Sequence, residues 1–530
     1  PPRSTLFPYT TLFRSPVEFD VREYHLQAPK EFYQQSSIGF LPHNVYANMP
    51  LGTEMLSLLG MVVAGDWWLG ALVGKTVIAS YAVLTALGLL AAGRRFAGRA
   101  AGAVAALVYL TVPWVVQVST LGLVDVALGC YLFLAFYAAC LAMGPATASL
   151  PASPLAAEAR SADRPVLRTQ YSVLILAGYL AGGAVACKYP GMLFAVLPLA
   201  CWVSFAFRDA ALPRWRIAWK PAAVLLLAAA VGCGLWFAKN WTMTGNPTYP
   251  LLYSAFGGET WTPEKDRQWN QVHRPHDFSP EALGRDMARV ALTSEWLSPL
   301  VVPLAALGLA FRSRRRLAIG LAVYVAFIIA AWWLLTHRID RFWIPALPLA
   351  ALLAGLAAVW SPERLWRITV VVLLILGSVA NFVAVSSIGG GYNRYFVSLA
   401  RLRDDPERVD VWHRYLNEHA KGGRVLLVGD AQPFDLAMPV LYNTCFDDCI
   451  FEQLVKGRSP QAIRAVLADR GITHVYVNWG EIARYRRTYG FTDFVQPAVF
   501  DELASAGILA PLPEIPNSSG RGYRVVPPPS

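Results

Sequence analysis

The sequence is poor in charged residues, which make up only 15% of its 530 positions, against about a quarter in an ordinary globular protein. The shortage accompanies a hydrophobic share of 55% and a mean hydropathy of +0.40. A soluble chain needs more charge to cover its surface and does not need many uninterrupted apolar stretches. The composition therefore excludes an ordinary soluble enzyme and indicates an integral membrane protein.

Several signatures of familiar chemistry are also missing. The chain has no GxSxG nucleophile turn and no paired CxxC motifs for zinc, and its VGDAQ turn at 428–432 lacks a full phosphate-binding or dinucleotide pattern. His273 and His276 do not have the spacing of a helical metal site. The formal charge of +11 does not indicate nucleic acid, because the basic residues stand in short loops between apolar runs.

Cysteine is scarce too, with seven residues in all. Five of them, in or beside apolar runs, are expected to be small buried hydrophobes: Cys130, Cys140, Cys187, Cys201 and Cys233. Cys445 and Cys449 lie in the C-terminal region, where a local disulfide and two unpaired thiols are both open.

What the chain does have is about ten apolar runs, each near the ~20 residues that cross a hydrocarbon core. They cover 68–92, 101–117, 120–143, 171–187, 190–207, 221–238, 291–311, 317–335, 342–360 and 368–386. Arg and Lys gather in the loops after every second run, as at Arg94, Arg95 and Arg99 or at Arg314, Arg315 and Arg316. The positive-inside rule makes that face cytoplasmic and predicts a multi-pass protein of the inner (cytoplasmic) membrane.

The same topology divides the chain into four parts. Residues 1–15 carry a near-repeat, TLFPYT then TLFRS, and are expected to be a non-native leader, with an initial membrane helix missing before Pro16. Residues 16–67 form a first outer loop, in which 23–35 and 52–63 are expected to be amphipathic helices on the membrane surface or helices packed against other loops. Residues 68–389 form the bundle, with a flexible linker at 145–170. Residues 390–530 are expected to form a small outer α/β domain, with strands at 424–429 and 473–477 and a helix at 460–470.

Acidic residues of the outer face are the first candidates for chemistry. Asp20, Glu23, His25 and Glu54 lie in the first loop beside Tyr24, and such a set could position a polar acceptor and take its proton. A solvated amphipathic loop is the alternative. Asp125 favours the catalytic interpretation, because a carboxylate near the end of an apolar run usually lines a cavity or meets a partner. A helix-capping carboxylate is the competing explanation.

Cations on the same face run against the positive-inside rule. Lys188 stands in ACKYPG, Lys239 in WFAKNWTMTGNPTYP, and His337, Arg338 and Arg341 in THRIDRFWIP. An anionic ligand such as a lipid-linked phosphate would explain them, whereas snorkelling to lipid headgroups would explain any one alone.

These segments, DVREYHLQAPKEFYQ, LPHNVYANMPLGTEML, LGLVDVAL, ACKYPG, KNWTMTGNPTYP and HRIDRFWIP, resemble the GT-C superfamily of polytopic membrane glycosyltransferases. More narrowly they are similar to bacterial relatives of the protein mannosyltransferases and of the aminoarabinose lipid A transferase, which are cell-envelope enzymes. The resemblance covers about residues 16–390. It implies a mostly α transmembrane bundle with an outer active site, and a sugar donor linked to polyprenyl phosphate or diphosphate.

The resemblance also assigns roles to residues. Asp20 matches the first-loop acid that serves as base or metal contact, Asp125 is similar to the second acidic position, and Val21 and Arg22 stand where relatives have an adjacent acid, so that Glu23 is the nearest substitute. The candidate substrate-binding residues are Tyr24, His25, Glu54, Lys188, Tyr189, Lys239, Asn240, His337, Arg338 and Arg341. The expected acceptor is a hydroxyl of a lipid, glycan or protein. No cofactor is expected to be required, although a divalent metal is possible.

A transporter or lipid flippase is the alternative function, but it would call for internal repeats and ionisable groups near mid-bilayer.

Overall fold

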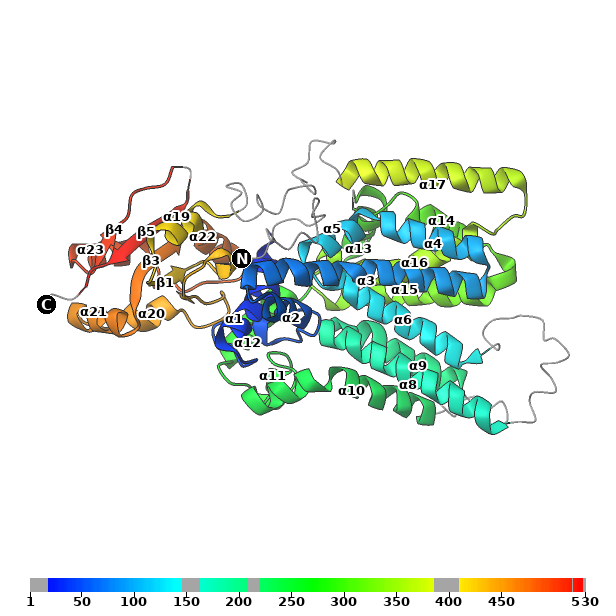
Figure 1. The fold of residues 1–530 in the computed structure, drawn as a ribbon, viewed down its shortest axis with the longest axis horizontal. Coiled ribbons are helices and arrows are strands. Elements are labelled where there is room, and N and C mark those ends of the chain that lie inside the picture. The colour runs from blue at the N-terminus through cyan, green and yellow to red at the C-terminus, as the bar shows by residue number, and fades with distance from the viewer. Residues whose placement is uncertain are drawn as a thin grey trace.

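The computed structural model describes residues 18–144, 163–207, 219–294, 296–385, 409–516 and 518–527. It consists of a long helical bundle and a smaller α/β domain at one end of it, with the first loop between the two (Figure 1). The expected leader at 1–15 and most of the expected linker at 145–170 lie outside these residues, and helix begins at Asp163. The mostly α fold with a small C-terminal sheet is therefore as predicted.

Seven helical segments of the described residues are long and apolar enough to cross a membrane. They are α3 (Trp67–Phe96), α6 (Asp125–Ala142), α8 (Asp163–Cys187), α10 (Trp219–Thr244), α15 (Arg315–Leu335), the pair η8 (Asp340–Ala346) and α16 (Leu347–Ala357), and α17 (Arg364–Val385). Each coincides with one of the ten apolar runs. Burial is deepest in α6 and in the pair η8 and α16, which therefore form the centre of the bundle.

The other three runs form shorter or broken helices. An eighth span is possible where α4 (Arg99–Thr111) and α5 (Pro113–Leu121) meet at 59°. The break falls at Pro113, because its ring and missing N–H prevent one helix from continuing through it. The run at 190–207 becomes η5 (Met192–Val196) and α9 (Leu197–Ala206), and the run at 291–311 keeps only α14 (Val301–Leu309) as α-helix.

Small residues let two neighbouring helices approach closely. A Cβ placed on Gly182 of α8 would lie 2.2 Å from the backbone oxygen of Ala229 in α10, and one on Gly178 would lie 2.3 Å from that of Leu225. Apolar side chains gain little by leaving lipid for a helix interface, so close backbone packing at small residues is what associates helices within a membrane.

The first loop is folded and largely buried. Its helices are the π-helix η1 (Val21–His25), α1 (Gln27–Gln35), η2 (Tyr46–Asn48) and α2 (Met55–Ala64). Residues 27–32 of α1 are all buried, so this helix packs against other parts of the protein, which was one of the two expectations. The second long loop, after α10, contains α11 (Tyr253–Phe256), α12 (Pro263–His273), α13 (Pro280–Ala288) and η6 (Arg289–Thr293), and η7 (Arg312–Arg314) precedes α15.

The C-terminal domain has a five-stranded sheet in the order β2-β1-β3-β5-β4. Strand β1 (Arg424–Val428) pairs in parallel with β2 (Val440–Leu441) and β3 (Ile472–Asn478), and β5 (Gly520–Val525) runs antiparallel to β3 and β4 (Leu509–Pro511). Its helices are α19 (Val411–His419), η10 (Pro433–Asp435), α20 (Ile450–Val455), α21 (Pro460–Asp469), α22 (Trp479–Thr488) and α23 (Pro497–Ser505). The strands expected at 424–429 and 473–477 and the helix at 460–470 are confirmed, and the thiols of Cys445 and Cys449 are free.

The C-terminal domain and the basic end of α3 lie at opposite ends of the bundle (Figure 1). Trp67, the first residue of α3, contacts Phe434 of the domain with ring centroids 5.1 Å apart. Arg94 and Arg95 are in the last turn of the same helix, which continues away from the domain (Figure 1). For α3, the two ends therefore lie on the two unlike faces that the charge pattern predicts.

Candidate active site

Two acids and two cations, all predicted from the sequence, meet where the bundle adjoins the domain. Arg341 forms an ion pair with Asp20, and its Nε lies 3.8 Å from Asp125 Oδ2. Lys188 Nζ lies 3.3 Å from the other oxygen of Asp125. The four side chains form a continuous chain of opposite charges, which we call the charge cluster.

Each member of the charge cluster comes from the end of a different element. Asp20 is the N-cap residue of η1, and Asp125 is the first residue of α6, after a turn at Gly122 with φ of 90°. Lys188 follows the last residue of α8, and Arg341 belongs to η8. Chain ends at one face of a bundle can place such groups together without opening the apolar interior.

The charge cluster is graded in exposure. The side chain of Asp125 is 2% exposed, whereas those of Arg341, Lys188 and Asp20 are 13%, 19% and 28% exposed. Burial raises the pKa of Asp20, but Arg341, His25 and Lys188 outweigh this and hold that pKa below its usual value. Burial also lowers the pKa of Lys188, although Asp125 opposes the change. Asp20 is thus an ionised carboxylate within reach of solvent.

Aromatic side chains lie next to the charge cluster at Phe342 and Tyr24. Lys188 Nζ lies 4.0 Å from the ring centre of Phe342. The rings of Tyr24 and Tyr46 stack at 5.4 Å, and Tyr46 touches Trp269 and Phe446. Aromatic rings beside a few convergent polar groups are typical of sites that bind a small molecule.

His25 and Glu54 form a buried pair beside Asp20. His25 Nδ1 lies 2.6 Å from Glu54 Oε1, and both side chains are almost fully buried. His25 Nε2 and Glu54 Oε2 are buried without a hydrogen-bond partner among the described residues. The pair therefore holds η1 against the start of α2 and keeps two unsatisfied polar atoms near the charge cluster.

Glu23 faces the C-terminal domain rather than Asp125. Burial, with Asp20 and Asp447 nearby, raises the pKa of Glu23 well above its usual value, while Arg484 opposes the change. A raised pKa favours the protonated carboxyl group, which suits a hydrogen-bond donor better than a base.

The remaining predicted residues lie in neighbouring contacts. The hydroxyl of Tyr189 donates a hydrogen bond to the backbone oxygen of Tyr249 and accepts one from Asn240, so these residues fix the loop after α10. Lys239 Nζ is buried without a hydrogen-bond partner among the described residues. The ring of His337 packs edge-on against Phe342, and burial lowers the pKa of His337 to about 3, so this imidazole is neutral.

Arg338 lies apart from the charge cluster. Its guanidinium pairs with Asp286 at 3.2 Å, donates to the backbone oxygens of Trp333 and Asp277, and stacks on the Trp333 ring. With φ of 58°, its backbone is in the left-handed region. These contacts hold α13 against the end of α15, and they leave the guanidinium little freedom to meet a ligand.

Contacts with the C-terminal domain form the part of the site that the sequence did not reveal. The buried Lys30 donates hydrogen bonds to the backbone oxygens of Phe434 and Leu436, and Tyr442 donates one to Glu31. Arg22 lies 3.2 Å from Asp435, and Asp447 accepts a hydrogen bond from the Val45 backbone. Because these partners are some 400 residues apart, no local pattern in the sequence could pair them.

No metal-binding cluster of three or more His, Cys, Asp or Glu side chains occurs within the described ranges. In the charge cluster itself, Arg341 and Lys188 already neutralise the two carboxylates. Asp20 and Asp125 are the acidic members of the cluster that a cation there would meet.

Solved structures share this architecture. ArnT from Cupriavidus metallidurans in the apo state is 14% identical to the chain and superposes with a TM-score of 0.57, over 98% of this chain and 96% of that one. The same protein bound to undecaprenyl phosphate is 15% identical over the same shares, again with a TM-score of 0.57. No family model and no curated protein sequence matches the chain. The chain therefore has an ArnT-like GT-C fold.

Proposed function

We propose that this chain, with its ArnT-like fold, is an integral membrane glycosyltransferase that moves a sugar from a polyprenyl-phosphate-linked donor to a hydroxyl acceptor. The observation that carries the proposal is the charge cluster, in which Arg341 and Lys188 meet Asp20 and Asp125 at one end of an apolar bundle. A site at the membrane rim suits a substrate whose tail lies in lipid and whose phosphate lies in a polar pocket. A solved structure with this fold contains undecaprenyl phosphate.

The donor phosphate would compete with Asp20 for Arg341. A guanidinium binds phosphate as readily as carboxylate, and the ammonium of Lys188 adds a second positive charge. When Arg341 turns to the phosphate, Asp20 loses the partner that lowers its pKa and becomes a better base. Asp125, being almost fully buried, would remain with Lys188 and hold that cation in place.

The reaction would then be a single displacement at the anomeric carbon. The acceptor oxygen forms a bond to that carbon while the bond to the phosphate oxygen breaks, and its electron pair leaves with the phosphate. The hydroxyl proton passes to Asp20. Arg341 and Lys188 stabilise the departing phosphate. One direct displacement inverts the anomeric centre.

The position of the charge cluster along the membrane normal favours a transferase over a transporter or flippase. Asp125 is the first residue of α6, and Arg341 is the second residue of η8, so both lie at a rim of the bundle and away from its middle. Transporters place their coupling and substrate sites near the bilayer midplane. By the Arg-rich loops at the other end, we assign the site and the C-terminal domain to the periplasmic or exterior side of the inner membrane.

The test uses membranes carrying the full chain. Asp20→Asn and Asp125→Asn should each lower transfer from undecaprenyl-phosphate-linked radiolabelled sugars to membrane acceptors by about 100-fold or more. Glu264→Gln, which changes an exposed acid on α12, is the matched control and should transfer normally. Undiminished transfer in both site variants, or movement of fluorescent undecaprenyl phosphate across liposomes without any sugar transfer, would show the proposal to be wrong.

A further inference from the structure

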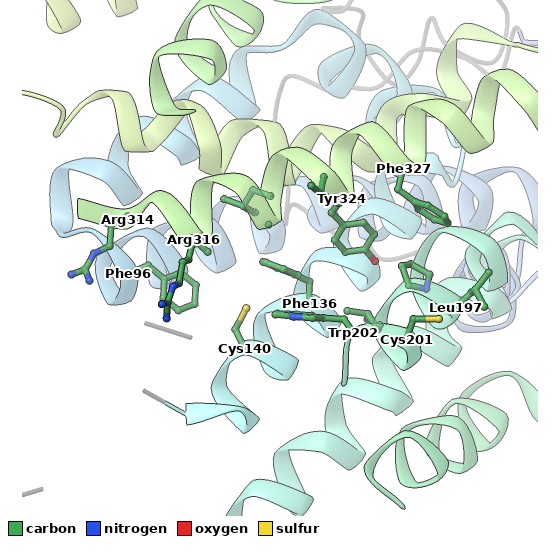
Figure 2. Close-up of a pocket in the computed structure, with 16 residues that line it drawn as sticks. Phe96, Phe136, Cys140, Leu197, Cys201, Trp202, Arg314, Arg316, Tyr324 and Phe327 are labelled. Atoms are coloured by element: carbon green, nitrogen blue, oxygen red, sulfur yellow. The ribbon is translucent and has the colours of Figure 1, made fainter. Parts of the chain in front are cut away.

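A large apolar cavity lies in the bundle away from the charge cluster. Its volume is about 600 Å³, and it lies between α6, α9 and α15, with Phe96 of α3 at one end. Figure 2 shows Phe136 and Trp202 facing Tyr324 across it. Cys140, also in its wall, is fifteen residues after Asp125 in the same helix, which places it about 22 Å along α6 from the charge cluster.

Among the described residues that line the cavity, the charged ones are two arginines. Arg314 and Arg316 lie at the end of the cavity nearest Phe96, and their guanidinium groups point away from Tyr324 (Figure 2). No acid among the described residues lines the cavity. Helix α15 begins at Arg315, so its positive N-terminal end adds to the field of the two side chains.

Among the other described residues of the wall, the polar side-chain groups are the indole N–H of Trp202, the thiols of Cys140 and Cys201 and one phenol hydroxyl. The hydroxyl of Tyr324 donates a hydrogen bond of 2.8 Å to the backbone oxygen of Phe194, so it is already satisfied. Other lining residues include Leu317, Leu321 and Phe327. An occupant must therefore be apolar along its length and anionic at one end.

The cavity opens sideways, toward the space that lipid fills. Val323 and Leu197, which both line it, are 62% and 48% exposed on a bundle that spans the membrane. From Arg314 to Phe327 the wall extends about 20 Å along α15, more than half of the ~30 Å hydrocarbon core. One acyl chain of a membrane lipid could enter from the side and lie along the helix.

We propose that this cavity binds one acyl chain of an anionic phospholipid from the bilayer leaflet on the Arg-rich face, with the lipid phosphate against Arg314 and Arg316. Basic pockets between membrane helices are known to hold anionic headgroups in this way. The lipid joins α15 to α6 and α9, and it is distinct from the donor of the proposed transferase. The proposal does not rest on that activity.

The experiment is native mass spectrometry of the full-length protein in detergent with added phosphatidylglycerol or phosphatidylcholine of identical chains. The parent should retain phosphatidylglycerol at least 5-fold more than phosphatidylcholine. Gly320→Phe should abolish retention of both, because Gly320 lines the cavity and a Cβ there meets nothing within 4 Å. Gly234→Phe on α10, also in open space, is the matched control.

Charge and folding are tested separately. The double change Arg314→Gln and Arg316→Gln should remove the preference for phosphatidylglycerol, whereas Arg364→Gln and Arg367→Gln, on α17, should keep it. Each variant is first required to match the parent in gel-filtration elution. The proposal would be overturned if the parent retained the two lipids equally or if Gly320→Phe retained them undiminished. It would also be overturned if the parent preferred undecaprenyl phosphate over both lipids and the changes at Gly320, Arg314 and Arg316 removed that preference. Asp20→Asn should retain phosphatidylglycerol normally, even if it transfers no sugar.

Discussion

Arg341 and Asp20 form an ion pair although 321 positions separate them in the sequence, and the same guanidinium also lies near Asp125. One planar cation thus serves two carboxylates from different elements. Arg341→Lys keeps the charge but loses the fork that reaches both acids and a phosphate. We expect kcat/KM for sugar transfer to fall about 100-fold.

A second measurement checks the cause of that loss. Binding of undecaprenyl phosphate to the detergent-solubilised protein should weaken in Arg341→Lys, while Arg285→Lys, which changes an exposed arginine of α13, should bind as the parent does. Unchanged binding and unchanged transfer in Arg341→Lys would contradict the assignment of Arg341 to the phosphate.

Lys30 stabilises the contact between the first loop and the C-terminal domain. Lys30→Met leaves the backbone oxygens of Phe434 and Leu436 buried without their donor, at a cost of roughly 1–3 kcal/mol for each unsatisfied group. Hydrogen exchange at residues 433–436 should therefore become faster. The exposed Lys421 of the same domain offers the control Lys421→Met, for which exchange should not change.

Asp447 should make the stability of this contact depend on pH. Burial raises the pKa of Asp447 to about 6, although hydrogen bonds from Thr444 and Val45 favour the carboxylate. Between about pH 4 and pH 6 the folded protein then binds more protons than the unfolded chain, so the free energy of unfolding falls as the pH rises through this window. The difference of about two pKa units corresponds to about 3 kcal/mol.

Thermal unfolding of Asp447→Asn between pH 4 and pH 7 measures this effect. The variant should lose most of the slope below pH 6 and should be more stable than the parent at pH 7. Asp448→Asn changes a neighbour that is largely exposed and pairs with Lys265, so its curve should follow that of the parent. A parent whose stability rises from pH 4 to pH 6 would refute the prediction.

Gly182 tests the packing of α8 on α10. Gly182→Ala places a Cβ 2.2 Å from a backbone oxygen of α10, so the helices must move apart, at a cost of about 1–3 kcal/mol. We expect a lower melting temperature and a lower yield of folded protein in detergent. Gly234→Ala, which adds the same methyl group where nothing lies within 4 Å, should leave both unchanged.

The sequence predicts those features that repeat a simple physical rule over many residues. Helix α15 can be predicted because its 21 residues form one apolar helix. Strand β3 can be predicted because THVYV combines β-branched and aromatic residues between turns. The break at Pro113 and the short helix α14 were not predicted, since helix length depends on packing as well as on hydropathy.

The charged residues of the candidate site were predicted from the sequence, but the residues with which each of them pairs were not. Arg338 and Arg341 look alike in THRIDRFWIP, yet the left-handed backbone at Arg338 and the acid at Asp286 place the two guanidinium groups in separate contacts. Likewise, nothing in the motif around Glu23 shows that it faces Asp447 and not Asp125. Which partner each of these side chains meets depends on contacts between residues that are far apart in the sequence.

The position of Lys30 and Glu31 has a consequence for how the protein is made. Their partners, from Phe434 to Tyr442, are synthesised some 400 residues later, which takes roughly 20–80 s on a ribosome. Throughout that interval the first loop lacks its later partners, which are the backbone oxygens of Phe434 and Leu436 and the hydroxyl of Tyr442. The contact between the first loop and the C-terminal domain can therefore form only when translation is nearly over, after all the helices of the bundle have been synthesised.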